Sequence, residues 1–178
     1  MLKIVTAPSP VLSNIAKPVS KITPLVQGIV EEMQQALLSA RDPVGVGLAA
    51  PQVERSLQIF ITKPTSKSKI HVFINPKIIQ KTKISHLTID NDRVNKLNKT
   101  IGKKSSTKLE GCLSLPNIWG EVRREPELTA SYLDEKGNLH ARTFSGFLAT
   151  IIQHEMDHLN GILFPKRVLE QQGTLYKS

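Results

Sequence analysis

Two histidines spaced four residues apart give the strongest chemical signal in this sequence of 178 residues. They bound the pentad HEMDH, His154–His158. At this spacing both imidazoles project from one face of an α-helix, one turn apart, which suits a single metal ion. Glu155 follows the first histidine, where its carboxylate can reach a water molecule on such an ion instead of the ion itself. An amphipathic helix with chance histidines is the alternative, and it would produce this pattern on the order of once in a hundred chains.

A catalytic metal site normally has three protein ligands and one open position, so the pentad needs a third donor. Cys112 is the only cysteine, which excludes an intramolecular disulfide, and Gly111 beside it lets the backbone pass close to an ion. A lone cysteine is nevertheless more often a small buried hydrophobe. From the residues alone the candidates for the third ligand are Asp157, Glu170, His140, His71, His86 and Cys112.

A third segment, Gly45–Gln52 (GVGLAAPQ), is rich in small residues. Its two glycines and two alanines allow the close approach of a ligand or of another part of the chain. A tight packing turn is the alternative. The segment lacks the spacing and the lysine of a phosphate-binding loop, which excludes that kind of site.

Two amphipathic helices are predicted to flank the middle of the chain. Thr23 followed by proline predicts a helix over about 24–40, which ends before Asp42-Pro43. Ser145 is expected to cap a second helix that carries the pentad and is closed by Gly161. The short tail after Pro165 is expected to add one turn of helix.

Strands are predicted between the two helices. The apolar runs 57–62 and 70–74 are expected to be strands, the second of them ended by Asn75-Pro76. A hairpin is predicted from 128–133 and 139–144 around a DEKGN turn. The predicted strands lie between the two helices and do not alternate with them. We therefore expect an α+β fold in which mostly antiparallel sheets surround a central C-terminal helix, with a second helix near the N-terminus.

Composition and charge limit the classes of protein to which the chain can belong. The length predicts a single catalytic domain over 1–178, with an exposed Lys- and Asn-rich insertion at about 82–108. The net charge of +9 is typical of a partner of polyanions such as the ribosome, and equally of a solvated basic surface. No signal peptide or membrane span is visible, so we expect a cytoplasmic protein without membrane contact, and an organellar mature form would look the same.

Taken together and in this order, the three segments resemble the signature motifs of the peptide deformylases. The matching strings are GxGLAAxQ at Gly45–Gln52, EGCLS at Glu110–Ser114 and QHExDHL at Gln153–Leu159. The resemblance covers most of residues 1–165, and three ordered motifs are far more specific than the His-Glu-x-x-His pentad that proteases share.

The resemblance implies a metal-dependent hydrolase that removes the formyl group from N-formylmethionyl nascent peptides. It implies that Cys112, His154 and His158 are the ligands of one divalent cation, with Fe²⁺ native and readily replaced by Zn²⁺, Ni²⁺ or Co²⁺. Water on the metal would be the nucleophile, and Glu155 the general acid/base. Gln52 and the backbone N–H of Leu113 would then stabilise the oxyanion.

Specificity is expected to come from the helix that carries the pentad. Phe147, Thr150 and Ile151 lie on or near the face that bears His154, and with Val46 and Gly47 they are expected to form a pocket for the methionine side chain. The alternative is that Phe147 and Ile151 belong to the core. By resemblance, Glu110 pairs with Arg124 to hold the cysteine segment, although two solvated charges are the competing reading.

The sequence departs from the family's pattern at two places, and three alternative functions compete with this hypothesis. The insertion makes the chain longer than is usual before Glu110, and Glu54 stands where the family commonly has glycine. The rivals are a metalloprotease or other amidase with the same pentad, a non-catalytic ribosome-associated relative, and a basic nucleic-acid module. Cys112 in EGCLS argues against the protease, and the metal constellation argues against the nucleic-acid module. The predicted state is a monomer.

Overall fold

The structure is a computed structural model that describes residues 2–41, 44–81 and 108–177. Apart from Lys108, the expected Lys- and Asn-rich insertion lies outside the described residues. Within those residues, two antiparallel sheets pack with α-helices, so the predicted α+β fold with mostly antiparallel sheets is confirmed.

The larger sheet has five strands in the order β1-β2-β3-β6-β7, and every neighbouring pair is antiparallel. Its strands are β1 (Gly47–Ala49), β2 (Ile59–Thr62), β3 (His71–Lys81), β6 (Glu127–Leu133) and β7 (Leu139–Ser145). The smaller sheet has the order β4-β5-β8. Its strands are β4 (Lys108–Cys112), β5 (Leu115–Val122) and β8 (Leu175–Lys177).

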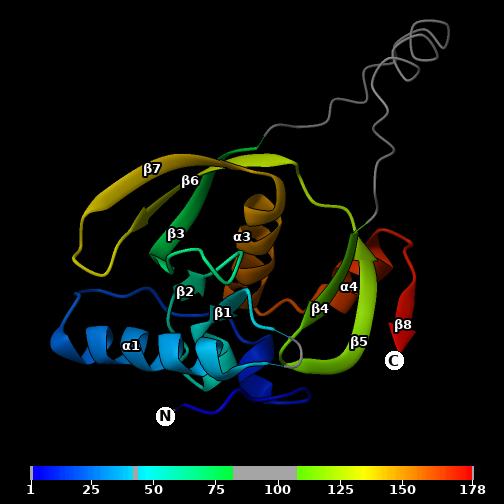
Figure 1. Ribbon diagram of the computed structural model, residues 1–178, viewed down its shortest axis with the longest axis horizontal. Coiled ribbons are helices and arrows are strands. Elements are labelled where there is room, and N and C mark those ends of the chain that lie inside the picture. The colour runs from blue at the N-terminus through cyan, green and yellow to red at the C-terminus, as the bar shows by residue number, and fades with distance from the viewer. Residues whose placement is uncertain (1, 42–43, 82–107, 178) are drawn as a thin grey trace, which may run out of the picture.

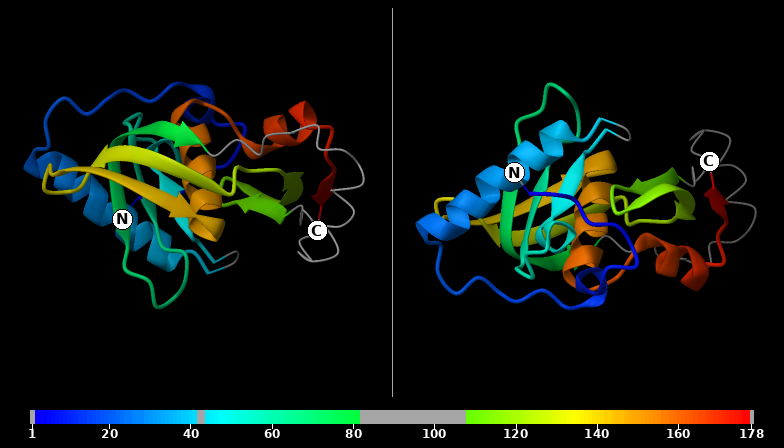
Figure 2. Two further views of the ribbon diagram at one scale, coloured as in Figure 1. Left: turned by 90° about the horizontal axis from the view of Figure 1, so that it is seen from above. Right: turned by 90° about the horizontal axis from the view of Figure 1, so that it is seen from below.

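Three α-helices pack with these sheets within the described residues: α1 (Pro24–Ser39), α3 (Gly146–Leu159) and α4 (Phe164–Glu170). Helix α3 lies between the larger sheet and the smaller one, and α4 lies beside the smaller sheet (Figure 1; Figure 2). Short 3₁₀ turns form η1 (Pro10–Ser13) and η2 (Ala50–Val53). No helix in the described part of the chain has both the length and the apolar character that crossing a membrane requires.

The helix boundaries follow the predicted signals closely, with one exception. Helix α1 begins after Thr23, whose hydroxyl accepts a hydrogen bond from the Val26 N–H at 3.4 Å. Gly161 ends α3 in the left-handed conformation, and the N–H groups of Gly161 and Ile162 bond the carbonyls of His158 and Asp157. Ser145 is the N-cap residue of α3 as predicted, and the exception is that its side chain makes no capping hydrogen bond.

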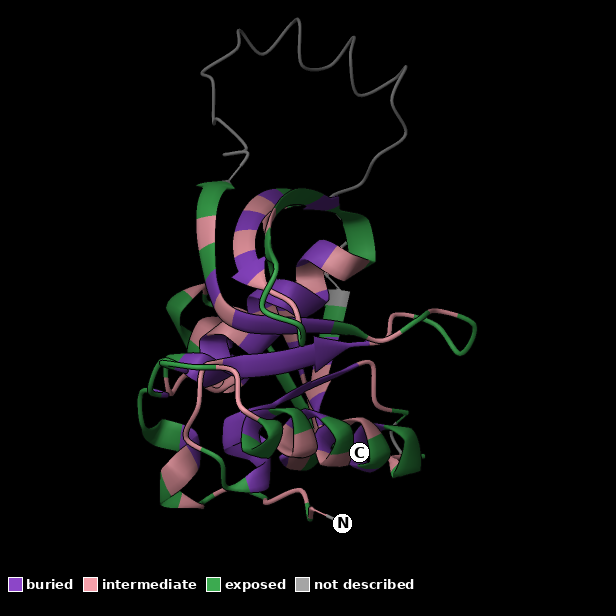
Figure 3. Ribbon diagram, turned by 90° about the vertical axis from the view of Figure 1, so that its left-hand side faces the viewer, coloured by how far each residue is buried: buried purple, intermediate pink, exposed green. Residues whose placement is uncertain are grey.

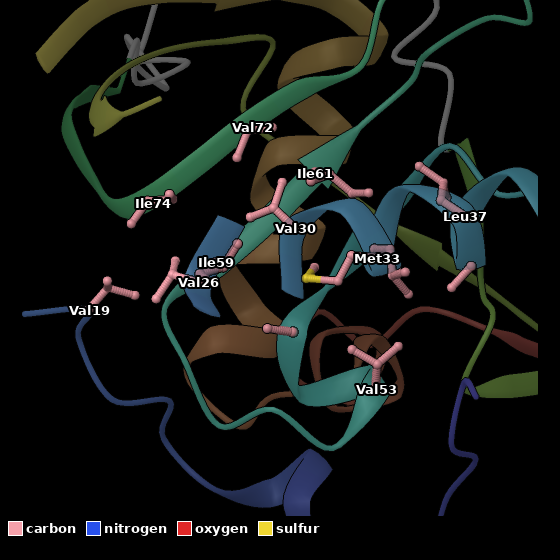
Figure 4. Packing of buried hydrophobic residues seen from close by; sticks show 13 residues of the cluster. Val19, Val26, Val30, Met33, Leu37, Val53, Ile59, Ile61, Val72 and Ile74 are labelled. Atoms are coloured by element: carbon pink, nitrogen blue, oxygen red, sulfur yellow. The ribbon is translucent and has the colours of Figure 1, made fainter. Parts of the chain in front are cut away.

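Strand β2 and the first half of β3 are buried on both faces of the larger sheet, which explains their continuous apolar runs. Ile59 and Ile61 point into the cluster under α1, whereas Phe60 between them joins the cluster on the α3 side. The cluster under α1 contains Val30, Met33, Leu37, Val72 and Ile74 among others (Figure 4). The outer face of α1 is exposed (Figure 3). The helix that carries the pentad therefore packs on a buried apolar cluster on the α3 side of the sheet.

Asn75-Pro76 does not end a strand, contrary to expectation, because β3 continues to Lys81. The pairing of β3 with β6 shifts register between Ile74 and Lys77, so the missing N–H of Pro76 falls at an irregularity of the ladder. Asn75 has a φ of 49°, and its side chain bonds both the N–H and the carbonyl of Val19 at 2.8 Å. Asparagine tolerates this left-handed conformation better than most residues.

Several other elements were missed by the sequence patterns. The segment Gly45–Gln52, for which a tight turn was the alternative to a ligand-binding segment, contains β1 and most of η2. Neither strand of the β4–β5 hairpin was predicted. Helix α4 spans seven residues instead of one turn. Glu54 follows η2 with φ 60° and ψ 27°, so the position where glycine is common does adopt a left-handed conformation here.

The β6–β7 turn depends on Asp134. Its carboxylate accepts hydrogen bonds of 2.9 Å from the N–H groups of Lys136 and Asn138, and from the side chains of Asn138 and His140. Burial opposes ionisation, but these bonds outweigh it and hold the pKa of Asp134 well below its usual range. A depressed pKa stabilises the folded state above the pKa of the unfolded chain, and this stabilisation is lost as the pH falls toward the folded value.

We therefore expect Asp134→Ala to lower the free energy of unfolding by about 1 kcal/mol at pH 7. The difference from wild type should shrink as the pH falls below about 4. Urea titrations at a series of pH values measure it, with the neighbouring exposed Glu135→Ala as the control. A loss of stability that does not change with pH would contradict the role given to the Asp134 carboxylate.

Candidate metal centre and active site

Three donor atoms converge at the junction between the two sheets. The Sγ of Cys112 and one nitrogen each of His154 and His158 all lie within 4.8 Å of one another. Cys112 Sγ is 3.2 Å from His158 Nε2. Cys112 ends β4, whereas both histidines project from α3, so the packing of α3 between the sheets produces this convergence. Among the described residues no other three histidine, cysteine or acidic side chains bring their donor atoms this close together.

The donor set fits a divalent transition metal. A sulfur and two imidazoles suit Fe²⁺, Zn²⁺, Co²⁺ and Ni²⁺, whereas Mg²⁺ and Ca²⁺ prefer oxygen ligands. The Nδ1 of His154 donates to a carboxylate oxygen of Glu110 at 3.0 Å, which leaves Nε2 as the nitrogen available to an ion. A carboxylate behind an imidazole is the usual arrangement around metal-ligating histidines.

Glu110 is itself held by a buried ion-pair network. Arg124 donates two hydrogen bonds to the Glu110 carboxylate, at 2.8 and 2.9 Å, and a third to Asp157 at 2.6 Å. Arg167 of α4 donates to the same Asp157 at 2.7 and 3.1 Å. The side chains of Arg124 and Glu110 are 8% and 6% exposed, so this pair is not the solvated alternative considered above. The network ties β4, α3 and α4 together behind the histidines.

These charges set the protonation of the surrounding groups. Burial alone would raise the pKa of Glu110 and of Asp157, but their arginine partners outweigh it and hold both pKa values below the usual range. Burial and the nearby His154 charge lower the pKa of His158 well below its usual value, which favours the neutral form that binds metals. Burial opposes the charge on His154, yet its bonds to Cys112 and Glu110 raise its pKa well above normal.

Glu155 is buried beside the histidines, 3% exposed, and lines the same pocket. Its Oε2 has no hydrogen-bond partner among the described residues. Burial, the largest effect, raises the pKa of Glu155 to about 7. A carboxyl group with a free oxygen and a pKa near neutrality can both accept and release a proton.

Gln52 is held in a single orientation next to the cysteine. Its Oε1 accepts the Ala49 N–H at 2.8 Å, so its Nε2 faces Cys112 Sγ at 3.5 Å and Ser114 Oγ at 3.2 Å. The glutamine is 2% exposed. Leu113, the other predicted stabiliser, lines the pocket beside it.

A pocket of about 260 Å³ opens onto these groups. All five residues predicted to receive a methionine side chain line it: Val46, Gly47, Phe147, Thr150 and Ile151. Phe147 is 48% exposed, so the alternative that it is plain core is wrong, whereas Ile151 is buried. The pocket therefore has an apolar wall from α3 and β1 and a polar end at the histidines.

The other candidates for the third ligand lie in different surroundings. The carboxylate of Asp157 accepts hydrogen bonds from Arg124 and Arg167. Glu170 forms an ion pair with Arg167 at 2.9 Å, and His140 is hydrogen-bonded to Asp134. His71 is exposed at the start of β3, and His86 lies outside the described residues.

Three residues that line the pocket were not singled out from the sequence: Val44, Leu109 and Trp119. Ser114, named only as the end of the EGCLS motif, is buried against Gln52. Because β4 and β5 lack a clear alternation of apolar and polar residues, their pairing was not predicted. The only available signal was that Trp119 is the single tryptophan of the chain.

Gly47 is required by the close approach of α3 to β1. A Cβ atom added there would overlap Glu155 Oε1 and would lie 2.8 Å from Ile151 Cγ2.

We expect Gly47→Ala to lower the free energy of unfolding by roughly 1–3 kcal/mol, because the neighbouring backbone and buried side chains must move. Urea denaturation measures this. Gly28→Ala is the matched control, since a Cβ there meets nothing within 4 Å in α1, and it should be stabilising. Equal effects at the two positions would contradict the packing argument.

Comparison with known proteins gives a consistent result. Residues 1–173 match the family described as polypeptide deformylase. A peptide deformylase of Desulforudis audaxviator is 34% identical over 177 residues, covering 99% of this chain and 97% of the relative. One from Christiangramia forsetii is 33% identical over 193 residues, covering 100% of this chain and 87% of the relative. The crystal structure of a peptide deformylase from Synechococcus elongatus in complex with actinonin is similar with a TM-score of 0.76 at 34% identity, over 94% of this chain and 78% of that one.

Proposed function

Because the chain belongs to the polypeptide deformylase family and is a hydrolase that acts on formyl-methionyl peptides, we propose that Cys112, His154, His158 and Glu155 form its catalytic centre. The observation that carries this proposal is the convergence of one sulfur and two imidazole nitrogens within 4.8 Å, in a pocket that also holds a buried glutamate. No other group of described residues offers such a donor set.

Cys112, His154 and His158 would hold one divalent cation, which we propose to be Fe²⁺ in the native enzyme, with Zn²⁺, Ni²⁺ or Co²⁺ as substitutes. Such a cation supplies Lewis-acid chemistry, in that it activates water as a nucleophile and polarises a carbonyl. The chain orients the ligands: Glu110 holds His154 through Nδ1, and Arg124 holds Glu110. Each supporting residue of this kind typically contributes 10–100-fold to metal affinity or activity.

Glu155 would carry the proton through the reaction. Its unpaired Oε2 would accept a proton from the attacking water as oxygen bonds to the formyl carbon. When the C–N bond breaks, the same oxygen would deliver that proton to the departing amine nitrogen. The products are formate and a peptide with a free methionine amino group. The buried position of Glu155 excludes bulk water, so the proton is kept within the site.

Gln52 and Leu113 would stabilise the negative charge that develops on the formyl oxygen. The Ala49 N–H fixes the Gln52 amide so that its Nε2 donors point toward Cys112. An oriented donor of this kind needs no reorganisation during the reaction, and its loss typically costs roughly 10²–10³ in rate. The backbone N–H of Leu113 would be the second donor.

The methionine side chain would enter the apolar part of the pocket. Ile151, Phe147 and Val46 offer an apolar surface to an unbranched thioether, and Thr150 makes one wall slightly polar. The lack of a side chain at Gly47 lets β1 pass close to Glu155 and Ile151.

The assay that tests this proposal pairs two substrates with the metal-loaded protein. We expect release of formate from formyl-Met-Ala-Ser and no digestion of casein. Casein digestion without formate release would favour the metalloprotease alternative. If neither substrate reacts, the chain would be a non-catalytic relative.

We further propose that the enzyme acts as a monomer in the cytoplasm on chains emerging from the ribosome. The net charge of +9 supports an electrostatic attraction to ribosomal RNA. Cosedimentation with ribosomes should then weaken as salt is added, because exposed charges are screened. Binding that does not respond to salt would contradict an electrostatic contact.

A further inference from the structure

Arg124 lies in an irregular segment that joins the two sheets. Strand β5 of the smaller sheet ends at Val122 and β6 of the larger sheet begins at Glu127, so residues 123–126 belong to neither strand. The guanidinium of Arg124 nevertheless holds both Glu110 and Asp157 behind the histidines. Because these four residues make no strand ladder, other contacts must hold the backbone on either side of Arg124.

Gln153 of α3 holds the residue that follows Arg124. Its Oε1 accepts the Glu125 N–H at 3.1 Å, and its Nε2 donates to the carbonyls of Glu125 at 2.9 Å and Ala149 at 3.0 Å. One primary amide thus binds both backbone groups of Glu125, as a neighbouring strand would. Gln153 is 7% exposed and directly precedes His154, so this contact ties the segment to the start of the pentad.

Gln171 at the end of α4 holds the residue that precedes Arg124 in the same way. Its Oε1 accepts the Arg123 N–H at 2.7 Å, and its Nε2 donates to the Arg123 carbonyl at 3.1 Å. The guanidinium of Arg123 donates in return to the Gln171 carbonyl at 3.1 Å. These bonds are exposed to solvent, whereas those of Gln153 are partly or fully buried, so we expect each of them to contribute less.

The two glutamine side chains therefore bind the backbone on both sides of Arg124. A shift of this backbone would move the Arg124 guanidinium and with it Glu110, whose carboxylate accepts the Nδ1 proton of His154 at 3.0 Å. We infer that Gln153 and Gln171 are positioning residues for the proposed metal centre. They act on His154 through Arg124 and Glu110. This inference rests on the proposed function, since it concerns the affinity of the same centre for its cation.

A purely structural role in the packing of α4 is the alternative for Gln171. Phe164 and Val168 of α4 belong to the same buried cluster as Cys112, so a loosened α4 would disturb the sulfur ligand. Positioning through Arg124 would instead act on the imidazole of His154. The two roles therefore predict effects on different ligands of the cation.

The first test measures Zn²⁺ affinity by competition with a chelator. Groups that hold a metal ligand directly typically contribute 10–100-fold, and the glutamines act further from the ion. We therefore expect Gln153→Leu to weaken Zn²⁺ binding roughly 10-fold and Gln171→Leu, with its exposed bonds, roughly 3-fold. Gln35→Leu changes an exposed glutamine of α1 and is the matched control, which should bind as wild type does.

The outcomes of this titration separate the inference from the function on which it rests. Wild-type affinity in Gln171→Leu would overturn the inference, and this surface variant decides the test if Gln153→Leu does not fold. Wild-type protein that binds no Zn²⁺ would instead refute the proposed function.

The second test asks whether Gln171 acts through Arg124. Where two residues act on the same group, their effects are not additive. In the Arg124→Met background, Gln171→Leu should therefore cause no further loss of Zn²⁺ affinity. A further loss of the full size seen in the wild-type background would overturn the inference, because Gln171 would then act by another route.

The third test observes the segment and the ligands separately. In the metal-free protein, hydrogen exchange of the Arg123 N–H should be faster in Gln171→Leu, and that of the Glu125 N–H faster in Gln153→Leu. Saturating Co²⁺ should still give the sulfur-to-metal charge-transfer band in Gln171→Leu, since Cys112 is untouched. Unchanged exchange at both amides would overturn the inference, as would loss of this band, which would place the effect on the sulfur.

Discussion

Glu155→Gln is expected to bind its metal normally and to lose deformylation by roughly 10²–10⁴-fold in kcat. The substitution keeps the shape of the side chain but removes its ability to take a proton. Glu155 is not one of the three converging donors, so the metal site itself should remain intact. Elemental analysis of the dialysed protein and the rate of formate release from formyl-Met-Ala-Ser give the two measurements.

Two further variants separate the role of Glu155 from that of the ligands. His154→Ala should lose both metal and turnover, because it removes one of three ligands. Glu170→Gln changes an exposed glutamate of α4 in the same way and should stay within about twofold of wild type, as surface substitutions usually do. Near-normal turnover by a metal-loaded Glu155→Gln protein would contradict the proton-carrying role proposed for Glu155.

The second large effect is expected from Arg124→Met. The substitution leaves the buried carboxylates of Glu110 and Asp157 without their shared guanidinium. Breaking a buried pair by removing one partner typically costs 3–5 kcal/mol, so we expect a loss of about that size in the free energy of unfolding. Urea denaturation of the metal-free protein measures it without interference from metal loss. Metal affinity should fall as well, by roughly 10–100-fold, since Glu110 no longer holds His154 firmly.

Arg167→Met is the matched control for this prediction. Its side chain binds the same Asp157 but is 31% exposed, so water can replace it, and we expect a loss of only about 1 kcal/mol. A double-mutant cycle of Glu110→Gln with Arg124→Met should show strong coupling. Additive effects in that cycle would mean that the pair does not hold the cysteine segment.

The parts of the fold that were predicted correctly are those with strong local signals. Helix α1 has a capping threonine, a proline in its first turn and regular apolar spacing, and the β6–β7 hairpin has alternating residues around a glycine-containing turn. The strand end at Pro76 was predicted wrongly because the local rule for proline ignores the register shift that accommodates it. The β4–β5 hairpin was missed because its apolar residues face a pocket and a helix in no simple alternation.

In the candidate site, too, the residues with a local sequence pattern were predicted and those brought together by long-range contacts were not. The helical spacing of His154 and His158 placed two donors from the sequence alone, but Cys112 lies 42 residues before the first of them and became the preferred third donor only by resemblance. Long-range contacts, such as that between Arg124 and Asp157, have no local pattern in the sequence. Trp119 reaches the pocket through strand pairing, which no motif indicated.

X-ray absorption spectroscopy of the metal-loaded protein tests the central claim most directly. The account predicts one sulfur and two imidazole nitrogens around each bound ion, and loss of the sulfur signal in Cys112→Ser, since the chain has no other cysteine. A metal shell without sulfur, or one that Cys112→Ser leaves unchanged, would contradict it.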